Sequence, residues 1–199
     1  MVKFTIDGAY KSIYKHRHIF KDIKPTIFIT TSFVGKKIQE SEYCDWEEMR
    51  ELKEMGWEIG NHTHTHKSFS TLKEEDIIKE IETSQEILKK ELGVEPTYFA
   101  YPSSDFTLRD VEITHRYFEK SRSCTPYTLK TLPGVIKGVF IARETTPQKV
   151  LKWICEKPNI TLVLHELEDE PVMFYAKGRF IKKRTTWKPE YLKKIINEL

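Results

Sequence analysis

The sequence predicts an α/β fold in which helices cover a mainly parallel sheet, either open or closed into a barrel. Short apolar runs typical of buried strands alternate with amphipathic stretches typical of helices from end to end. Capping residues mark the starts of several amphipathic stretches. With 199 residues, of which 39% are hydrophobic, the chain can build one sizeable core, so we expect a single domain over residues 1–199.

The expected strands are short, apolar and bounded by turns or polar residues, as strands buried on both faces of a sheet are. They cover residues 2–6, 25–30, 57–60, 97–101, 139–142 and 160–164. In both forms of this fold, functional groups gather at the carboxyl ends of the parallel strands. A motif that follows a strand directly is therefore a candidate for function.

The expected helices are marked by their ends. Asp45 opens the first with a capping box, and this helix runs to about Met55. Thr71 opens a second capping box, and Gly93 ends the helix that follows it. Further helices are expected over residues 107–119, over 147–156 with Thr146 as the cap, and from 189 to the end of the sequence.

Composition and charge exclude several classes of protein. A net charge of +3 on a chain that is 32% charged indicates a solvated surface and no nucleic-acid partner. No apolar run approaches the roughly 20 residues that span a bilayer, and the first residues show no export leader. Cys44, Cys124 and Cys155 are widely spaced, which suits free, at least partly buried thiols in a reducing compartment. We therefore expect a cytoplasmic protein without a membrane partner, of undetermined oligomeric state.

Three of the seven histidines, His62, His64 and His66, fall within five positions directly after the expected strand 57–60. Imidazole nitrogens are common ligands of zinc-type ions. If the segment is a strand, all three share a face, and if it bends into a helical turn, His62 and His66 converge and His64 points away. In both cases His62 and His66 can meet on one ion. The alternative is a polar loop with surface histidines.

Three further segments place polar groups after strands. Asp7 follows the first strand and suits a base, a metal ligand or a helix cap. His165 follows strand 160–164, where a lone histidine is more often structural. Tyr101, Pro102 and Ser103 end strand 97–101 in a turn. We expect Asp7, His165 and the histidine segment to meet around one cavity.

The order of these segments resembles the polysaccharide deacetylases of the chitooligosaccharide deacetylase type, also called carbohydrate esterase family four. The family motif Phe-Thr-Phe-Asp-Asp-Gly-Tyr-Lys-Ser compares with Phe4 to Ser12. The motif Gly-x-His-Thr-x-x-His is matched by Gly60 to His66, Phe-Ala-Tyr-Pro by Phe99 to Pro102, and Leu-x-Leu-His by Leu162 to His165. Residues 30–33 also resemble the family.

The resemblance implies a distorted (β/α) barrel of the TIM type with about seven strands. It also implies a hydrolase that removes N-acetyl, or alternatively O-acetyl, groups from a carbohydrate, which is chemistry on carbon–nitrogen bonds other than peptide bonds. The implied partner is an acetylated glycan or small sugar. The implied cofactor is a divalent metal ion, zinc foremost, with cobalt or nickel as alternatives.

The resemblance also implies roles for single residues. In the family mechanism a metal ion binds the acetyl oxygen and a water, an aspartate acts as base, and a histidine protonates the departing amine. His62 and His66 match the metal ligands, and His165 matches the general acid. The loop of Tyr101, Pro102 and Ser103 matches the segment that contacts the oxyanion and the sugar, although Ser103 begins a Ser-Ser pair where Tyr-Gly is usual.

One departure affects the metal site, because the family has adjacent aspartates, a base and then a ligand, and this chain has one. Aligned without gaps, Asp7 falls on the base and Gly8 on the missing ligand. Aligned on the Asp-Gly pair, Asp7 is the ligand and the base is missing. We prefer the first alignment because it keeps residues 10–12 in register. A two-histidine ion would then have to recruit another group, such as His64, Asp105 or Glu166.

Two alternatives to an active deacetylase follow. The first is a catalytically weakened or inactive relative that binds a sugar or a partner in the same cleft. The second treats His62 and His64 as the H-x-H motif of a barrel metallohydrolase acting on cyclic amides or phosphate esters. Those folds usually place the motif after the first strand, whereas here it follows at least two.

Overall fold

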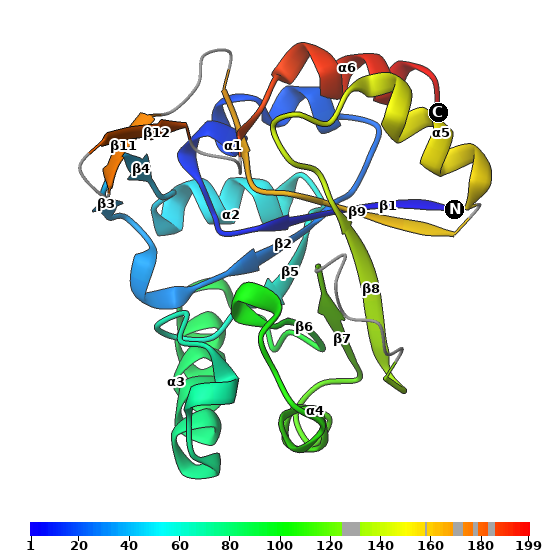
Figure 1. Ribbon diagram of the computed structural model, residues 1–199. Coiled ribbons are helices and arrows are strands. Elements are labelled where there is room, and N and C mark those ends of the chain that lie inside the picture. The colour runs from blue at the N-terminus through cyan, green and yellow to red at the C-terminus, as the bar shows by residue number, and fades with distance from the viewer. Residues whose placement is uncertain (125–131, 158, 169–172, 177–178, 183–185) are drawn as a thin grey trace.

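The structure is a computed structural model that describes residues 1–124, 132–157, 159–168, 173–176, 179–182 and 186–199. Within these residues, parallel strands close into a barrel in the order β1-β2-β5-β6-β7-β8-β9. Helices lie around the outside of this barrel, with α5 and α6 on one side and α3 and α4 on the other (Figure 1). The expected TIM-like barrel of about seven strands is confirmed.

The elements have the following bounds. The barrel strands are β1 (Val2–Asp7), β2 (Thr26–Ile29), β5 (Glu58–Asn61), β6 (Tyr98–Ala100), β7 (Lys120–Ser123), β8 (Val135–Phe140) and β9 (Ile160–Leu164). The helices are α1 (Lys11–Lys15), α2 (Trp46–Glu54), α3 (Glu74–Leu92), α4 (Leu108–Thr114), α5 (Pro147–Glu156) and α6 (Pro189–Asn197), with 3-10 turns η1 (Arg17–Phe20), η2 (Thr31–Phe33), η3 (Phe69–Thr71) and η4 (Pro102–Ser104). Small sheets pair β3 (Lys37–Ile38) with β4 (Ser41–Glu42), β10 (Glu166–Leu167) with β13 (Thr186–Trp187), and β11 (Met173–Ala176) with β12 (Arg179–Lys182).

Closure of the barrel rests on β1, which pairs in parallel with β2 on one side and β9 on the other. Thr5 lies opposite Thr26 of β2 and opposite Val163 of β9. Because every barrel strand runs the same way, the residues that follow β1, β5, β6 and β9 all emerge at one edge. This edge carries Asp7, the histidine segment, Tyr101 and His165.

Side chains of the barrel strands alternate between two environments. Ile27 and Ile29 of β2 belong to the main hydrophobic cluster, which also includes buried residues of α1, α2, α3, α5 and α6. Phe28, between them, belongs to a separate small cluster with Tyr98 and Ala100. Phe28, Tyr98 and Ala100 therefore form a small cluster inside the barrel, and the larger apolar core lies between strands and helices.

Several expected helix ends are confirmed. The carboxylate of Asp45 accepts from the Glu48 N–H at 2.9 Å, and the Glu48 carboxylate accepts from the Asp45 N–H at 3.0 Å. The Thr146 side chain accepts from the backbone of Lys149 at the start of α5. Gly93 ends α3 in the left-handed conformation, with φ of 64°. These helix ends are set by capping side chains and by a glycine, which can be recognised in the sequence alone.

Other element boundaries were predicted wrongly. Helix α3 begins at Glu74 with Lys73 as its cap, because Thr71 ends η3 and its hydroxyl donates to the Ser68 carbonyl at 2.7 Å. Helix α4 ends at Thr114 rather than at residue 119. Strand β7 was not predicted because its sequence, Lys-Ser-Arg-Ser, carries no apolar residue.

The expected burial of the cysteines is partly confirmed. Cys44 is buried and Cys124 is half-buried, but Cys155 is exposed, so the expectation of burial is wrong for Cys155. Among the helices in the described ranges, none is both long and apolar enough to cross a membrane.

Gly60 on β5 allows the Phe28 ring to lie against the strand, since a Cβ at Gly60 would overlap that ring. Gly60→Ala is expected to lower the free energy of unfolding by about 1–3 kcal/mol, because Phe28 is fully buried in a filled interior. Urea denaturation measures this. In a Phe28→Leu background the same change should cost less, and an equal cost in both backgrounds would contradict the overlap.

Candidate functional site

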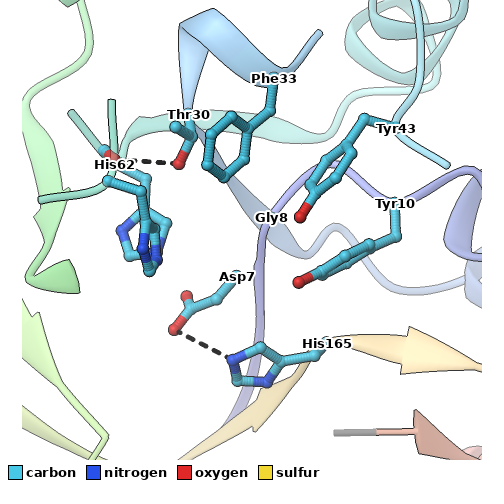
Figure 2. Close-up of a pocket in the computed structure, with 9 residues that line it drawn as sticks. Asp7, Gly8, Tyr10, Thr30, Phe33, Tyr43, His62 and His165 are labelled. Carbon is cyan, nitrogen blue, oxygen red and sulfur yellow. Dashed lines mark hydrogen bonds and ion pairs between the residues drawn. The ribbon is translucent and has the colours of Figure 1, made fainter. Parts of the chain in front are cut away.

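A pocket with a volume of about 150 Å³ opens at the carboxyl edge of the barrel. Its lining comes from residues that are distant in sequence: Asp7, Gly8, Tyr10, Thr30, Phe33, Tyr43, His62, His66 and His165. Figure 2 shows Asp7 between His62 and His165, with Tyr10 and Tyr43 on the opposite wall. The structure therefore brings Asp7 together with His62, His66 and His165.

His62 follows β5 directly and is held from two sides. Its ring Nδ1 lies 2.8 Å from the Ala100 carbonyl, and its own carbonyl accepts from the Thr30 hydroxyl at 3.1 Å. A carbonyl only accepts, so Nδ1 carries the proton and Nε2 keeps its lone pair. His62 is therefore fixed in the tautomer that can ligate or accept through Nε2.

A left-handed turn brings His66 back to His62. Thr63 and His66 have φ of 67° and 62°, and the His66 N–H donates to the Thr63 hydroxyl at 3.0 Å. The two imidazole rings lie 4.7 Å apart between centroids, at 80°. His64 does not line the pocket, and its Nδ1 lies 2.9 Å from the Thr31 hydroxyl. His62 and His66 converge and His64 lies apart, as expected for a bent segment, but the bend uses left-handed residues and is not a helical turn. An H-x-H metal site is thereby left without its second histidine.

Asp7 lies in a buried ion pair with Arg122 of β7. The exposed fractions of the two side chains are 5% and 1%, and Arg122 Nη2 contacts Asp7 Oδ1. The other carboxylate oxygen, Oδ2, lies 4.0 Å from His165 Nε2. The guanidinium also lies over the Phe28 ring, 4.8 Å from its centroid. Arg122 therefore holds one oxygen of Asp7, and the other lies near His165.

The pKa values of these groups follow from burial and from one another. Burial alone would raise the pKa of Asp7, but Arg122, His62 and His165 together lower it below its usual value. Burial, then the neighbouring His66, lowers the pKa of His62 to about 3. Burial also lowers the pKa of His66 and of His165. Near neutral pH the pocket therefore holds neutral imidazoles beside a compensated carboxylate.

An aromatic wall faces the histidines. The ring centroids of Tyr10 and Tyr43 lie 4.8 Å apart, with an angle of 31° between the ring planes. The Phe33 ring centroid lies 5.1 Å from that of Tyr43 and 6.0 Å from that of His66. The hydroxyls of Tyr10 and Tyr43 are hydrogen-bonded, and burial raises the pKa of both. Figure 2 shows both hydroxyls pointing into the pocket. This wall offers apolar ring faces with neutral polar tips.

Tyr101, Pro102 and Ser103 are absent from the pocket lining. The Tyr101 ring is buried against Phe99 and stacks on Phe106 at 4.0 Å, and its N–H donates to the Arg122 carbonyl at 3.1 Å. Neither its ring nor its N–H is therefore free to meet a ligand in this pocket. Pro102 is buried and Ser103 is exposed, and a role for either in binding sugar stays a prediction.

The side chains do not complete the three-ligand metal site that the resemblance implies. Gly8 offers no ligand, and Asp7 faces Arg122 and His165. The candidate replacements all bind elsewhere: His64 contacts Thr31, Asp105 accepts from Ser70, and Glu166 accepts from Ser41. Within the described part of the chain, no group of three or more histidine, cysteine or acidic side chains is placed to hold an ion.

Arg122 and Tyr43 are the site residues that the sequence did not reveal. Arg122 stands 115 residues from Asp7, in a strand without apolar residues. Tyr43 reaches the pocket because it pairs with Tyr10 as an isolated backbone bridge. The single available signal was an arginine in the middle of a short polar segment, which is unusual for a buried strand.

Comparisons with known proteins agree on one family. The family model for polysaccharide deacetylases matches residues 19–117. The chain is 26% identical over 136 residues to the uncharacterized protein YlxY of Bacillus subtilis (strain 168), which covers 66% of this chain and 39% of YlxY. The match thus spans well under half the length of that relative.

Two solved structures share the fold. IcaB from Ammonifex degensii has a TM-score of 0.64 and 24% identity, covering 75% of this chain and 70% of IcaB. A mutant of the CE4 family pseudoenzyme BA3943 of Bacillus anthracis, with restored enzymatic activity, has a TM-score of 0.67 and 18% identity, covering 100% of this chain and 61% of that one. The matched family model and the closed barrel, together with the ordered motifs, show that the chain belongs to the polysaccharide deacetylase family.

Proposed function

We propose that the pocket binds an acetylated glycan or small sugar, and that the metal centre needed to hydrolyse it is incomplete. The observation that carries this proposal is Gly8 in the place of the family's second aspartate, while Asp7 is bound to Arg122. Deacetylases of this family are generally metal-dependent. A chain that offers two histidines and no third ligand is expected to hold such an ion weakly.

The shape of the pocket supports a sugar ligand. Because a water molecule takes about 30 Å³ in the liquid, a cavity of about 150 Å³ admits a group of acetyl size and not a whole glycan. The remainder of the sugar would lie at the mouth, against the ring faces of Phe33, Tyr10 and Tyr43. Aromatic walls with a few neutral polar groups are typical of sites for uncharged ligands.

A metal-dependent N-deacetylase is the second candidate, favoured by the shared lining of Asp7, His62, His66 and His165. In that case Asp7 would take a proton from the attacking water, and His165 would give one to the departing amine. The contacts of Asp7 with Arg122 and His165 support the ungapped alignment, in which Asp7 is the base. Activity would then need a third metal ligand from outside the pocket lining.

Calorimetric titration with an acetylated chito-oligosaccharide tests binding. We expect the wild-type protein to bind with the same affinity in EDTA and in zinc. Phe33→Ala should weaken binding roughly tenfold through loss of one ring face. Leu108→Ala, at a residue of α4 that is 56% exposed and outside the pocket, is the matched control. Absence of binding, or binding that EDTA abolishes, would overturn the proposal.

Acetate release separates the two candidates. We expect none above the blank when the protein is incubated with the same sugar and with zinc, cobalt or nickel. If acetate is released and His62→Ala abolishes the release, the second candidate replaces the first. Release that survives His62→Ala would point to a contaminating enzyme.

A further inference from the structure

The backbone turns sharply directly after Asp7. Gly8 has φ of 77°, its N–H donates to the Phe28 carbonyl at 3.1 Å, and its carbonyl accepts from the Tyr10 N–H at 2.9 Å. This turn folds the Tyr10 ring back over Gly8. A Cβ built on Gly8 would lie 2.6 Å from Tyr10 Cε2 and 3.1 Å from Cζ, closer than side-chain atoms pack.

The Tyr10 ring is held in this place by several contacts. Tyr10 pairs with Tyr43 across an isolated bridge, and their rings pack at 4.8 Å. The carbonyl of the adjacent Ala9 accepts from the Cys44 N–H at 2.7 Å. Tyr10 is also the N-terminal cap residue of α1. Moving the ring away from Gly8 therefore means disturbing a packed tyrosine pair, not turning a free side chain.

Gly8 and Tyr10 both line the pocket into which His62 and His66 point. The side chain of an aspartate at position 8 would leave the backbone at this wall. The Tyr10 ring occupies the place that its Cβ would take. The family motif carries the same tyrosine but places its glycine at the position of Ala9. The loss of the ligand and the position of the ring are thus two parts of one local arrangement.

We propose that the Tyr10 ring closes the position from which a third ligand would reach the His62–His66 pair. A metal centre then returns only when a carboxylate is added at position 8 and the ring is removed from position 10. This proposal rests on the incomplete metal centre of the proposed function, but it does not depend on whether the pocket binds a sugar.

Cobalt(II) titration followed by visible absorption tests the proposal without any need for activity. We expect wild type, Gly8→Asp and Tyr10→Ala to bind cobalt weakly. Gly8→Asp/Tyr10→Ala should bind it roughly 100-fold more tightly, since groups that merely hydrogen-bond to metal ligands already contribute 10–100-fold. Gly8→Asp/Tyr10→Phe keeps the ring and removes only the hydroxyl, so it should behave as Gly8→Asp does.

Several outcomes would overturn the proposal. If Gly8→Asp alone or Gly8→Asp/Tyr10→Phe reaches the affinity of Gly8→Asp/Tyr10→Ala, the ring is no obstacle. A folded Gly8→Asp/Tyr10→Ala that gains no affinity also contradicts it. Should that variant lose cooperative unfolding, Gly8→Asp/Tyr10→Ser repeats the test with a polar residue at the turn.

Location and independence are checked separately. Adding His62→Ala to Gly8→Asp/Tyr10→Ala should remove the gained cobalt binding, and binding that survives would place the ion elsewhere and overturn the proposal. Sugar titration of the wild-type protein reports on the proposed function alone. Failure of that titration with success of the cobalt series would reject sugar binding and leave the role of Tyr10 intact.

Discussion

Arg122→Met is expected to lower the free energy of unfolding by about 3–5 kcal/mol, because it leaves the Asp7 carboxylate buried without its cation. Methionine keeps an unbranched chain over the Phe28 ring, so most of the loss reports on charge rather than on packing. A domain is stable by only about 5–15 kcal/mol, so this change removes a large share of the total. Urea denaturation at pH 7 measures it.

The control for this prediction removes both charges. Asp7→Asn alone should be similarly damaging, because it leaves the guanidinium of Arg122 buried and unpaired. The double variant Asp7→Asn/Arg122→Met should recover most of the lost stability, since replacing both members of a buried pair is often nearly neutral. If each single change costs less than about 1 kcal/mol, the value of an exposed pair, the two groups are not desolvated as described.

Stability is expected to fall steeply as the pH drops from about 6.5 to about 4, the range in which unfolded histidines take up protons. The folded protein resists this uptake, because burial lowers the pKa of His62 to about 3 and also lowers the pKa of His66 and His165. The unfolded state then binds more protons, so stability decreases with acid. Each such histidine contributes roughly 1.4 kcal/mol per pH unit.

The carboxylate of Asp7 adds to the effect at lower pH. Its pKa is lowered in the folded state, so its contribution is present above the unfolded value of about 3.9 and is lost as pH falls through the folded value. Urea denaturation between about pH 3 and pH 7.5 measures the slope, with the histidine contribution above about pH 4 and the onset of the Asp7 contribution below it. His62→Gln should reduce the slope by about one proton, whereas His18→Gln, at an exposed position of η1, should leave it unchanged. Equal slopes for wild type and His62→Gln would contradict the burial of a neutral imidazole.

The sequence predicted a mainly parallel sheet covered by helices because most of its strands are buried on both faces and therefore read as apolar runs. The closed form of the sheet was implied by the family resemblance and not by these runs. Strand β7 was not predicted because Arg122 and the two serines that flank it are buried polar residues. The segment therefore has no apolar pattern. Thr71 was wrongly predicted to cap a helix, because a hydroxyl three residues before an acid satisfies the capping-box pattern. In the structure this hydroxyl donates to the Ser68 carbonyl. Local patterns locate elements well when burial is apolar and poorly when it is polar.

The site was predictable only in part for a similar reason. The spacing of His62 and His66 predicts that their side chains converge if the chain bends after the strand. Asp7 and His165 follow strands whose carboxyl ends meet at one edge of the sheet. Whether the segment stayed extended or turned was left open, because the left-handed conformation at Thr63 and His66 has no marker such as glycine. The pairing of Asp7 with Arg122 depends on the whole barrel, and no local pattern encodes a contact across 115 residues.

The pairing of β1 with β9 affects how the chain folds during its synthesis on the ribosome. The Thr5 hydroxyl donates to the Leu162 carbonyl at 3.1 Å, across 157 residues of sequence. At translation rates of about 5–20 residues per second, β1 waits roughly 8–30 s for this neighbour. Meanwhile one of its edges offers unpaired amides and carbonyls to any other nascent copy. Crowded polysomes and slow elongation should thus favour mispairing between chains, and rapid completion of the last barrel strand should protect against it.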